Sequence, residues 1–309
     1  MADHTIEPLA GNIHGRFTAK IAPILTIDSG DTVTFKLIDA GWNTYALPAD
    51  FDNVEKFTPR NREVDRGHAM HGPIAINGAK AGMVLEIRLR EIVVGEWGWS
   101  GAGWRDSFNE TYDLESPPET IYWTFSEDKQ TATNQDGMTV KLSPFLGNIG
   151  MPQEASGEHS TTPPRWCGGN IDCKELVAGS TLYLPISVDG ALISFGDGHA
   201  VQGNGEVAGP ALECGMERVV IDMILRDDLD WTMPRAHTPA GWVTFGFNED
   251  LKKAQEQALY EMLTLITEQY KVTRRYAHSL ASLLVDLNVT QIVNGVQGVH
   301  AILPHGAIE

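Results

Sequence analysis

Short alternations of apolar and polar residues, separated by turn sequences, fill most of this chain. Over residues 31–39 the side chains of Val33, Phe35 and Leu37 alternate with polar neighbours, and the same period recurs over residues 84–90. Successive side chains of a strand point to opposite faces, so this period indicates strands with one buried face. The chain's 31 glycines and 16 prolines provide the turns between such segments. Many short strands of this kind favour a mainly β fold with a β-sandwich or barrel-like body.

The strand pattern continues to about residue 247 and then changes. The other expected strands are 22–28, 121–126, 138–143, 181–188, 191–196, 216–226 and 242–247. Asn248 can then cap a helix with apolar residues at helical spacing, and Thr273 can cap a second helix before a strand–turn–strand pattern at the end. We therefore expect a β-rich body over 1–240 that carries the polar loops. The rest, 241–309, is expected to be an α+β segment of two helices and terminal strands, packed on the body as one structural unit.

Composition and charge exclude several classes of partner. The formal net charge of −18 argues against nucleic acid and anionic membranes. No apolar run reaches the roughly 18 residues that a membrane span requires, and the first residues lack the basic and apolar regions of a secretory signal. The three cysteines, Cys167, Cys173 and Cys214, fit a reducing compartment because their number is small and odd. We therefore expect a cytoplasmic protein with no nucleic-acid or membrane partner.

The segment ALISFGDGHAVQGNGEVAGPALECG, residues 191–215, is the most informative for function. Its polar side chains include Asp197, His199, Gln202, Glu206 and Glu213. Glycine permits backbone turns that other residues resist, so a loop of this kind can direct several side chains to one point. An Asp-x-His pair beside two carboxylates can bind a divalent metal or transfer protons. The alternative is a polar hairpin turn with solvated charges.

A second polar cluster lies upstream of this segment. The sequence Gly-Gly-Asn-Ile-Asp at 168–172 resembles the later loop in composition, and the strand expected at 181–188 follows it. Two similar loops thus flank one expected hairpin. We therefore expect residues 170–172 and 197–199 to meet around one site.

Two further segments carry residue types that are common in binding sites. His68 and His71 precede an expected strand, and either can ligate a metal, although an isolated histidine more often has a structural hydrogen-bonding role. The segment GEWGWSGAGW places Trp97, Trp99 and Trp104 among glycines. It is expected to be a flexible lid or pocket wall, or else an ordered loop whose tryptophans pack on the core.

Together these motifs resemble the acetamidase/formamidase family. The resemblance rests on the segments HGPIAINGAKAGMVLEI, SPFLGNIG, GEHSTTPPRWCGGNIDCKEL, GSTLYLPISVDGALISFGDGHAVQGNGEVAGPALEC and SLLVDLNVTQIVNGVQGVHAILP, in this order between about residues 68 and 304. It implies hydrolysis of short aliphatic amides to ammonia and a carboxylate, a mainly β fold with α/β additions, and a divalent metal in some members. The site residues it implies are Asn170, Asp172, Asp197, His199 and Glu213.

Individual positions agree with the family pattern to different degrees. His68 matches a family histidine, whereas His71 stands where the family often has threonine. Cys167 stands where many members have a histidine before Gly-Gly-Asn, which puts a metal role at position 167 in doubt.

We hypothesise metal-assisted hydrolysis of a small neutral amide. Asp172, Asp197 and His199, with His68 as a further candidate, would hold a divalent ion, zinc or calcium in view of the ligand types. Glu213 would accept the proton of water and Asn170 would orient the substrate or the developing oxyanion. The candidates for the substrate pocket are Trp97, Trp99 and Gln202. The C-terminal segment can pack on its own body or on a partner, and a homo-oligomer is expected.

Three alternatives remain open at this point. The first is a hydrolase of a cyclic or N-formyl amide, and the second is a non-catalytic β protein that binds a metal or ligand. The third is a thiol-dependent amidase, since Cys173, Lys174 and Glu175 are the residue types of such a triad. Neighbouring residues of a strand face opposite sides, however, so three consecutive residues seldom form a triad.

Overall fold

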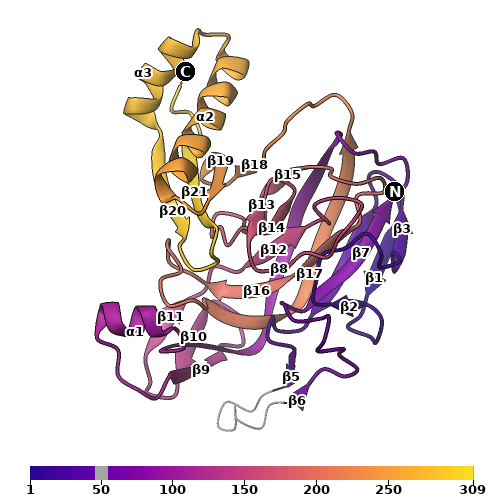
Figure 1. The fold of residues 1–309 in the computed structure, drawn as a ribbon, viewed down its shortest axis with the longest axis vertical. Coiled ribbons are helices and arrows are strands. Elements are labelled where there is room, and N and C mark those ends of the chain that lie inside the picture. The colour runs from indigo at the N-terminus through magenta and orange to yellow at the C-terminus, as the bar shows by residue number, and fades with distance from the viewer. Residues whose placement is uncertain (46–54, 309) are drawn as a thin grey trace.

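The fold is a curled, mainly antiparallel β-sheet with helices at its periphery (Figure 1). The computed structural model describes residues 1–45 and 55–308. Nineteen of the described strands join one hydrogen-bonded sheet, while β5 (Asn43–Tyr45) and β6 (Glu55–Lys56) form a small separate pair. The expected mainly β body with C-terminal helices is confirmed.

The elements follow one another along the chain in this order. The first strands of the main sheet are β1 (Asp3–Ile6), β2 (Ile13–His14), β3 (Leu25–Ile27), β4 (Thr32–Leu37), β7 (Met70–Ile76) and β8 (Val84–Ala102). After the short helix α1 (Asp106–Tyr112) come β9 (Glu119–Phe125), β10 (Thr131–Asn134), β11 (Thr139–Lys141), β12 (Phe145–Gly150), β13 (Pro164–Arg165) and β14 (Gly168–Asn170). The last elements are β15 (Thr181–Pro185), β16 (Ile193–Val201), β17 (Leu212–Arg226), β18 (Arg235–Thr238), β19 (Gly241–Asn248), α2 (Leu251–Tyr270), α3 (Arg274–Leu284), β20 (Asp286–Gln291) and β21 (Gln297–Pro304).

Two long strands, β8 and β17, lie side by side at the centre of the sheet and exchange partners along their length. Along the edge that faces away from β8, β17 pairs first with β16 and then with β4. Along the edge that faces away from β17, β8 pairs first with β15 and then with β9. The register between β8 and β17 shifts near Cys214 and Met216, and such irregularities bend strands and increase their twist. These shifts therefore contribute to the curl of the sheet.

The alternation seen in the sequence corresponds to a buried face in the structure. In β4 the side chains of Val33, Phe35 and Leu37 are buried, whereas Lys36 between them is exposed. Burying a side chain of this size stabilises the fold by roughly 1.5–3 kcal/mol. The same core includes apolar side chains of β8, β16 and β17, so the strands that carry the polar cluster are fixed by their other face.

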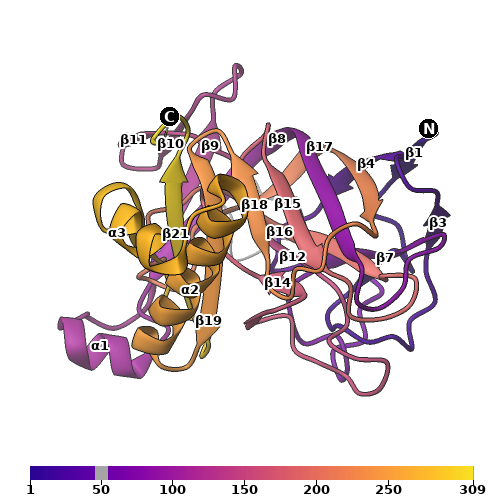
Figure 2. The ribbon, with the colours of Figure 1, turned by 90° about the horizontal axis from the view of Figure 1, so that it is seen from above.

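The C-terminal helices form a second core with the end of the sheet. Helix α2 packs against β19 and β21, and α3 packs against α2 (Figure 2). Thr273 caps α3 as expected, but the cap of α2 is Asp250 and not Asn248, because Asp250 accepts the backbone N–H groups of Lys252 and Lys253. Among the described residues no helix has the length and apolar character that crossing a bilayer requires.

Two glycine-rich segments that the sequence suggests as loops are strands instead. Residues 95–102 are the second half of β8, and residues 197–201 continue the strand expected at 191–196 to form the end of β16. At Gly98 a Cβ atom would lie 2.5 Å from Leu212 Cδ2 and 2.7 Å from the carbonyl oxygen of Glu213. Glycine in a strand often marks such a close approach. Residues 95–102 of the Trp-rich segment are therefore part of the sheet and not a flexible lid, and Trp104 follows the end of β8.

Candidate active site

Three side chains on neighbouring strands form a row. His199 of β16 is paired with Glu213 of β17, and Glu213 is paired with Trp99 of β8. Directly paired residues present their side chains on the same face of a sheet. His199 Nε2 lies 3.2 Å from Glu213 Oε1, and the backbone N–H of Ala211 donates to the same oxygen at 2.9 Å. The sheet thus holds an imidazole, a carboxylate and an indole side by side.

Strands β12 and β14 bring a second acid to this row. β12 pairs with β16 on one edge and with β14 on the other. Asp172 follows β14, and its backbone N–H donates to the carbonyl oxygen of Gly147 at 3.1 Å. Ligand atoms of Asp172, Asp197 and His199 all lie within 4.8 Å of one another, with His199 Nε2 at 3.4 Å from Asp197 Oδ1. The fold therefore brings residues 170–172 and 197–199 together.

Loops complete the cluster from two further directions. Glu206, between β16 and β17, forms a second group of possible ligands with His199 and Glu213. Asn294, from the turn between β20 and β21, donates through Nδ2 to Asp172 Oδ2 at 2.6 Å. Gln202 Nε2 donates to the backbone carbonyl of Asp172 at 2.8 Å. The C-terminal segment and the β16–β17 loop thus fix the position of this aspartate.

The backbone is strained at three of the four acids. Asp172, Asp197 and Glu206 have φ angles of 53°, 61° and 47°, in the left-handed region that residues other than glycine rarely adopt. Such a conformation costs about 1–3 kcal/mol for each residue and persists only where the surroundings enforce it. Strain at three buried acids of one cluster is typical of a functional site.

The charges of the cluster are strongly coupled. Burial and the charge of Asp197 raise the pKa of Asp172 well above its usual value, and burial and the charge of Asp172 do the same for the pKa of Glu206. Burial also opposes ionisation of Asp197, but the charges of His68 and His199 outweigh it and bring its pKa to about 2. Burial lowers the pKa of His199, whereas Glu213 and Asp197 raise it well above its usual value. Without a bound cation, the cluster therefore retains protons near neutral pH.

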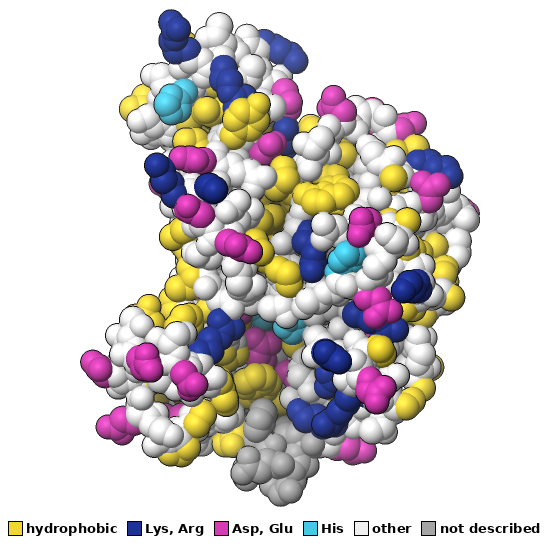
Figure 3. All heavy atoms as spheres, viewed as in Figure 1, with side chains coloured by type: hydrophobic (Ala, Val, Ile, Leu, Met, Phe, Trp, Pro, Cys, Tyr) yellow, Lys and Arg dark blue, Asp and Glu magenta, His cyan; other side chains and the backbone are white. Residues whose placement is uncertain are grey.

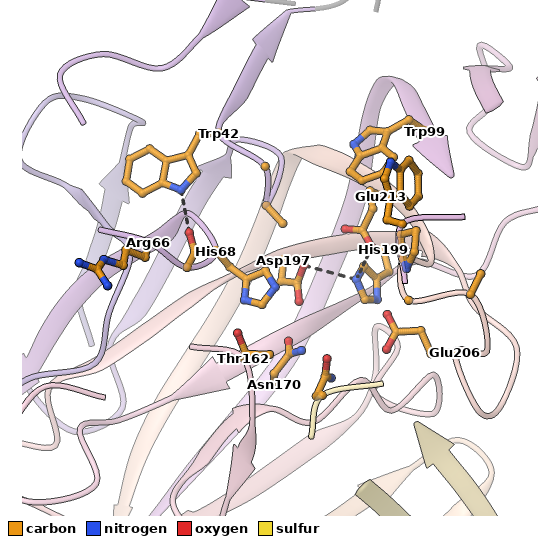
Figure 4. A pocket seen from close by; sticks show the side chains of 18 of the residues that line it. Trp42, Arg66, His68, Trp99, Thr162, Asn170, Asp197, His199, Glu206 and Glu213 are labelled. Atoms are coloured by element: carbon orange, nitrogen blue, oxygen red, sulfur yellow. Dashed lines mark hydrogen bonds and ion pairs between the residues drawn. The ribbon is translucent and has the colours of Figure 1, made fainter. Parts of the chain in front are cut away.

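The cluster lies at the floor of a cavity of about 440 Å³ (Figures 3 and 4). Indole rings of Trp42, Trp99 and Trp104 line its walls. Trp99 is held by a hydrogen bond of 2.9 Å from Nε1 to Asp39 Oδ1, and its ring packs edge-on against that of Trp104. In Figure 4 the side chains of Asn170, Asp197, His199 and Glu213 converge on the cavity.

A divalent cation fits this donor set. Among the described residues, Asp172 Oδ1, Glu206 Oε2, Glu213 Oε2 and Asn170 Oδ1 are buried and accept no hydrogen bond. Buried charges are costly unless they are paired or coordinate a metal. Gly147 leaves the necessary space, because a Cβ atom there would lie 2.5 Å from Asp172 Oδ1 and 2.8 Å from Asp197 Oδ2. Carboxylates with one imidazole suit several divalent ions.

The structure places the candidate residues from the sequence in different positions relative to this cluster. Asn170, Asp197, His199 and Glu213 line the cavity, and Asp172 lies directly behind them. His68 lies in the cavity wall, where its Nδ1 is 2.9 Å from Thr161 Oγ1, and it is outside both groups of close ligand atoms. Of the pocket candidates, Trp99 lines the cavity. Trp97 and Gln202 do not line it, although Gln202 supports Asp172 from behind.

Several residues of the site had no clear signal in the sequence. Glu206 belongs to the glycine-rich segment, but nothing in its spacing separates it from a solvated turn residue. Asn294 lies in a turn sequence far along the chain, and Asp39 follows β4 without any accompanying motif. Gly147 contributes only by lacking a side chain. A contact map or a structure is needed to find residues of this kind.

The three cysteines do not take part in this arrangement. All are buried, and none lines the cavity. Burial raises the pKa of Cys167 to about 11 and that of Cys173 to about 12, and it raises the pKa of Cys214 well above its usual value. A buried thiol that stays protonated is a poor nucleophile, so this geometry argues against a thiol-dependent amidase.

Comparisons with known proteins identify the family of this chain. The profile of the Acetamidase/Formamidase family matches residues 2–156 and 152–235. A formamidase of Methylophilus methylotrophus is 23% identical over 248 residues, which are 64% of this chain and 60% of the relative. This chain thus spans about 60% of the length of the first curated relatives that it matches.

Solved structures share the fold over nearly the whole chain. The crystal structure of a predicted acetamidase/formamidase from Thermoanaerobacter tengcongensis has a TM-score of 0.84 at 23% identity and covers 98% of this chain and 96% of its own. An acetamidase from Bacillus halodurans has a TM-score of 0.82 at 28% identity and covers 97% of each chain. Since the family profile also matches well over half of the residues, this chain belongs to the acetamidase/formamidase family.

Proposed function

We propose that this chain hydrolyses short aliphatic amides to ammonia and a carboxylate. The observation that carries the proposal is the contact between His199 and Glu213 at the floor of a cavity, beside Asp172 and Asp197, in a member of this family. Amide hydrolysis requires a base for the proton of water, donors for the developing oxyanion and a proton for the leaving nitrogen. The cluster offers groups for each of these tasks.

Asp172, Asp197 and His199 are the residues that would hold a divalent ion, with His68 in the cavity wall as a further candidate. Such an ion, when bound, polarises the amide carbonyl and makes a water molecule more acidic. The mixture of carboxylate and imidazole ligands suits zinc or calcium. Asn294 and Gln202 keep Asp172 in place through hydrogen bonds to its carboxylate and its backbone carbonyl.

Glu213 is suited to move the proton. The backbone N–H of Ala211 fixes its Oε1, while Oε2 accepts no hydrogen bond from the described residues. The free oxygen can take a proton from water and deliver it to the nitrogen as the C–N bond breaks. Asn170 lines the same cavity and can donate its Nδ2–H to the carbonyl oxygen as negative charge develops there. Trp99 limits the space beside Glu213.

The decisive experiment measures ammonia release from formamide and acetamide, together with the metal content of the purified protein. Replacing a residue that transfers a proton lowers the rate by about 10²–10⁴-fold, so Glu213→Gln is expected to lose activity to this extent while it keeps its metal. The matched control is Glu217→Gln, which changes an exposed glutamate of the same strand. Near-normal turnover by a folded, metal-containing Glu213→Gln variant would exclude the proposed role.

The same assay separates the alternatives. Opening of a cyclic amide consumes water without releasing ammonia, so product analysis by mass spectrometry accompanies the ammonia measurement. Bound metal with no turnover of any amide would indicate a binding protein. For a thiol-dependent enzyme, Cys167→Ala and Cys173→Ala would abolish activity. We expect both variants to keep the activity, because these thiols are buried outside the cavity.

A further inference from the structure

The cavity is larger than a short amide requires. Its volume of about 440 Å³ falls within the range of roughly 300–1,000 Å³ that is typical of pockets for drug-sized ligands. Formamide and acetamide are only a few atoms larger than water. An amide bound beside Glu213 would therefore leave most of the space between the floor and the rim unused. Three tryptophans line the cavity and give this space a partly apolar wall.

Acidic side chains lie deep in this cavity and basic side chains lie near its opening. The acids that line it are buried at the floor, whereas the arginines that line it reach solvent; they are Arg60, Arg66 and Arg105. Figure 3 shows acidic side chains and histidine within the hollow and basic side chains on both sides of it. The chain as a whole carries a formal net charge of −18. A positive rim on so acidic a protein attracts anions to this opening.

The arginines differ in how far their guanidinium groups are engaged. Arg60 stacks on Trp42, with Cζ at 4.4 Å from the ring centroid, and its Nε donates to the carbonyl oxygen of Asp65. The Nη1 group of Arg105 donates to the carbonyl oxygen of Val293. In the described part of the chain, Arg66 uses only its Nε, which donates to a backbone carbonyl. Within residues 1–45 and 55–308, none of the three arginines forms an ion pair with a carboxylate.

We propose that Arg66 and Arg60 bind a carboxylate at the far end of the substrate, so that the preferred substrates are monoamides of dicarboxylic acids. The inference rests on the proposed function, because it places the amide of the substrate at the floor. Arginine binds carboxylates through two parallel N–H···O bonds. Both arginines line the same cavity, and Arg60 lies near the backbone beside Arg66, since its Nη2 is 3.5 Å from the carbonyl oxygen of Gly67. A neutral amide gains nothing from such a rim.

The reaction is the amide hydrolysis proposed above, and only the group attached to the amide carbonyl carbon differs. The oxygen of water bonds to the amide carbonyl carbon and the C–N bond breaks. The nitrogen takes a proton and leaves as ammonia, and the second carboxylate of the product replaces the amide. Neither an oxidant nor a second substrate is required.

The test compares two amides of equal chain length. Glutaramate and pentanamide differ only in whether the far end is a carboxylate or a methyl group, and shorter and longer homologues of each cover the unknown span of the cavity. Hydrogen bonds to charged groups contribute enough for about 10–100-fold discrimination, so we expect a kcat/KM ratio in this range in favour of the anionic amide. Because the rim is exposed, the ratio should fall as salt is added.

Substitutions of the rim arginine Arg66 test whether it causes the preference for the anionic amide. Arg66→Gln is expected to lower the ratio about tenfold, and Arg66→Lys to retain part of it, since lysine keeps the charge but not the paired donors. The control is Arg275→Gln, which removes an exposed arginine from α3 and should leave both rates unchanged. An unchanged ratio in Arg66→Gln would overturn the assignment.

A binding measurement keeps the two proposals distinguishable. Calorimetry compares glutarate with pentanoate on the metal-loaded protein, and glutarate is expected to bind more tightly in the wild type but not in Arg66→Gln. If short amides are hydrolysed while glutaramate has no advantage at any chain length, the rim inference is wrong and the proposed function stands. If no amide is hydrolysed, the proposed function fails. In that case, equal binding of glutarate and pentanoate would still contradict carboxylate binding by the rim arginines, and tighter binding of glutarate would support it.

Discussion

Gly147 shows how a single residue can control the site without contributing a side chain. A Cβ atom at this position would lie within 2.8 Å of Asp172 Oδ1, Asp197 Oδ2 and His199 Cε1, so Gly147→Ala must push these groups apart. Disturbing the groups that orient metal ligands typically costs 10–100-fold in metal affinity. We expect a loss of about this size, measured by titration with zinc and with calcium.

The control for this substitution is Gly203→Ala, because no atom of the described residues lies within 4 Å of a Cβ atom at Gly203. It should bind metal as the wild type does. Equal affinities of wild type and Gly147→Ala would show that the ion is bound away from Asp172, Asp197 and His199.

Protonation of His199 predicts a pH dependence of metal binding. Glu213 and Asp197 raise the pKa of this imidazole well above its usual value despite burial, so it carries a proton near neutral pH when no ion is bound. Coordination of an ion by this imidazole would displace that proton, and the raised pKa values of Asp172 and Glu206 act in the same direction. Apparent affinity should therefore rise with pH.

Calorimetry in two buffers of different ionisation enthalpy measures this effect directly. We expect net proton release on metal binding at neutral pH, and a smaller release in a His199→Gln variant. Proton uptake, or an affinity that does not change with pH, would contradict coordination by this histidine.

At the level of elements, the pair β8–β17 is the part of the sheet that positions Glu213 against Trp99. Gly98→Ala would place a Cβ atom 2.5 Å from Leu212 Cδ2 and 2.7 Å from the backbone oxygen of Glu213. Overpacking of this kind destabilises a fold by about 1–3 kcal/mol. We expect a lower midpoint of thermal unfolding for this variant. Gly95→Ala on the same strand, with its nearest atom at 3.2 Å, should lose less, and equal losses would show that the close approach at Gly98 is not the cause.

Strand β4 and helix α3 could be predicted from sequence because their signals are local. The alternation of Val33, Phe35 and Leu37 reflects one buried face, and Thr273 caps its own helix. Strands β8 and β16 could not be predicted over their glycine-rich parts, since glycine there serves contacts between strands that are distant in the sequence. The short helix α1 buries no side chain and left no apolar period to detect.

The candidate site could be predicted only in part, for the same reason. The residues of the two motifs meet because β12 pairs with β14 on one edge and with β16 on the other. The hairpin expected between the motifs is wrong, since β15 pairs with β8 and β18 and β16 pairs with β12, β17 and β7. Asn294 reaches Asp172 from 122 positions along the chain, and no local pattern carries information over that separation. A sequence therefore indicates which types of residue form such a site better than it indicates which individual residues belong to it.

For the whole molecule, the central feature is that the C-terminal segment reaches the site. We proposed that residues 241–309 pack on the body as one structural unit, and two contacts support this proposal. β18 continues the sheet from β15 to β19, and Asn294 donates to Asp172 beside His199 and Asp197. Metal bound at the floor should thus stabilise the C-terminal strands together with the body.

This coupling predicts how hydrogen exchange responds to metal. Ligand at 100 times its Kd adds about 2.7 kcal/mol to the free energy of unfolding, and in the wild type the added protection should extend to β20 and β21 as well as β16. In Asn294→Ala the metal-dependent protection of the β16 amides against exchange should remain. The protection of the β20 and β21 amides should fall, because the hydrogen bond from Asn294 to Asp172 is lost. Gln297→Ala is the control, since Gln297 donates to Glu249 within the C-terminal segment and should leave the response intact. Metal-dependent protection of β16 alone in the wild type would show instead that the segment is an independent unit that merely covers the site.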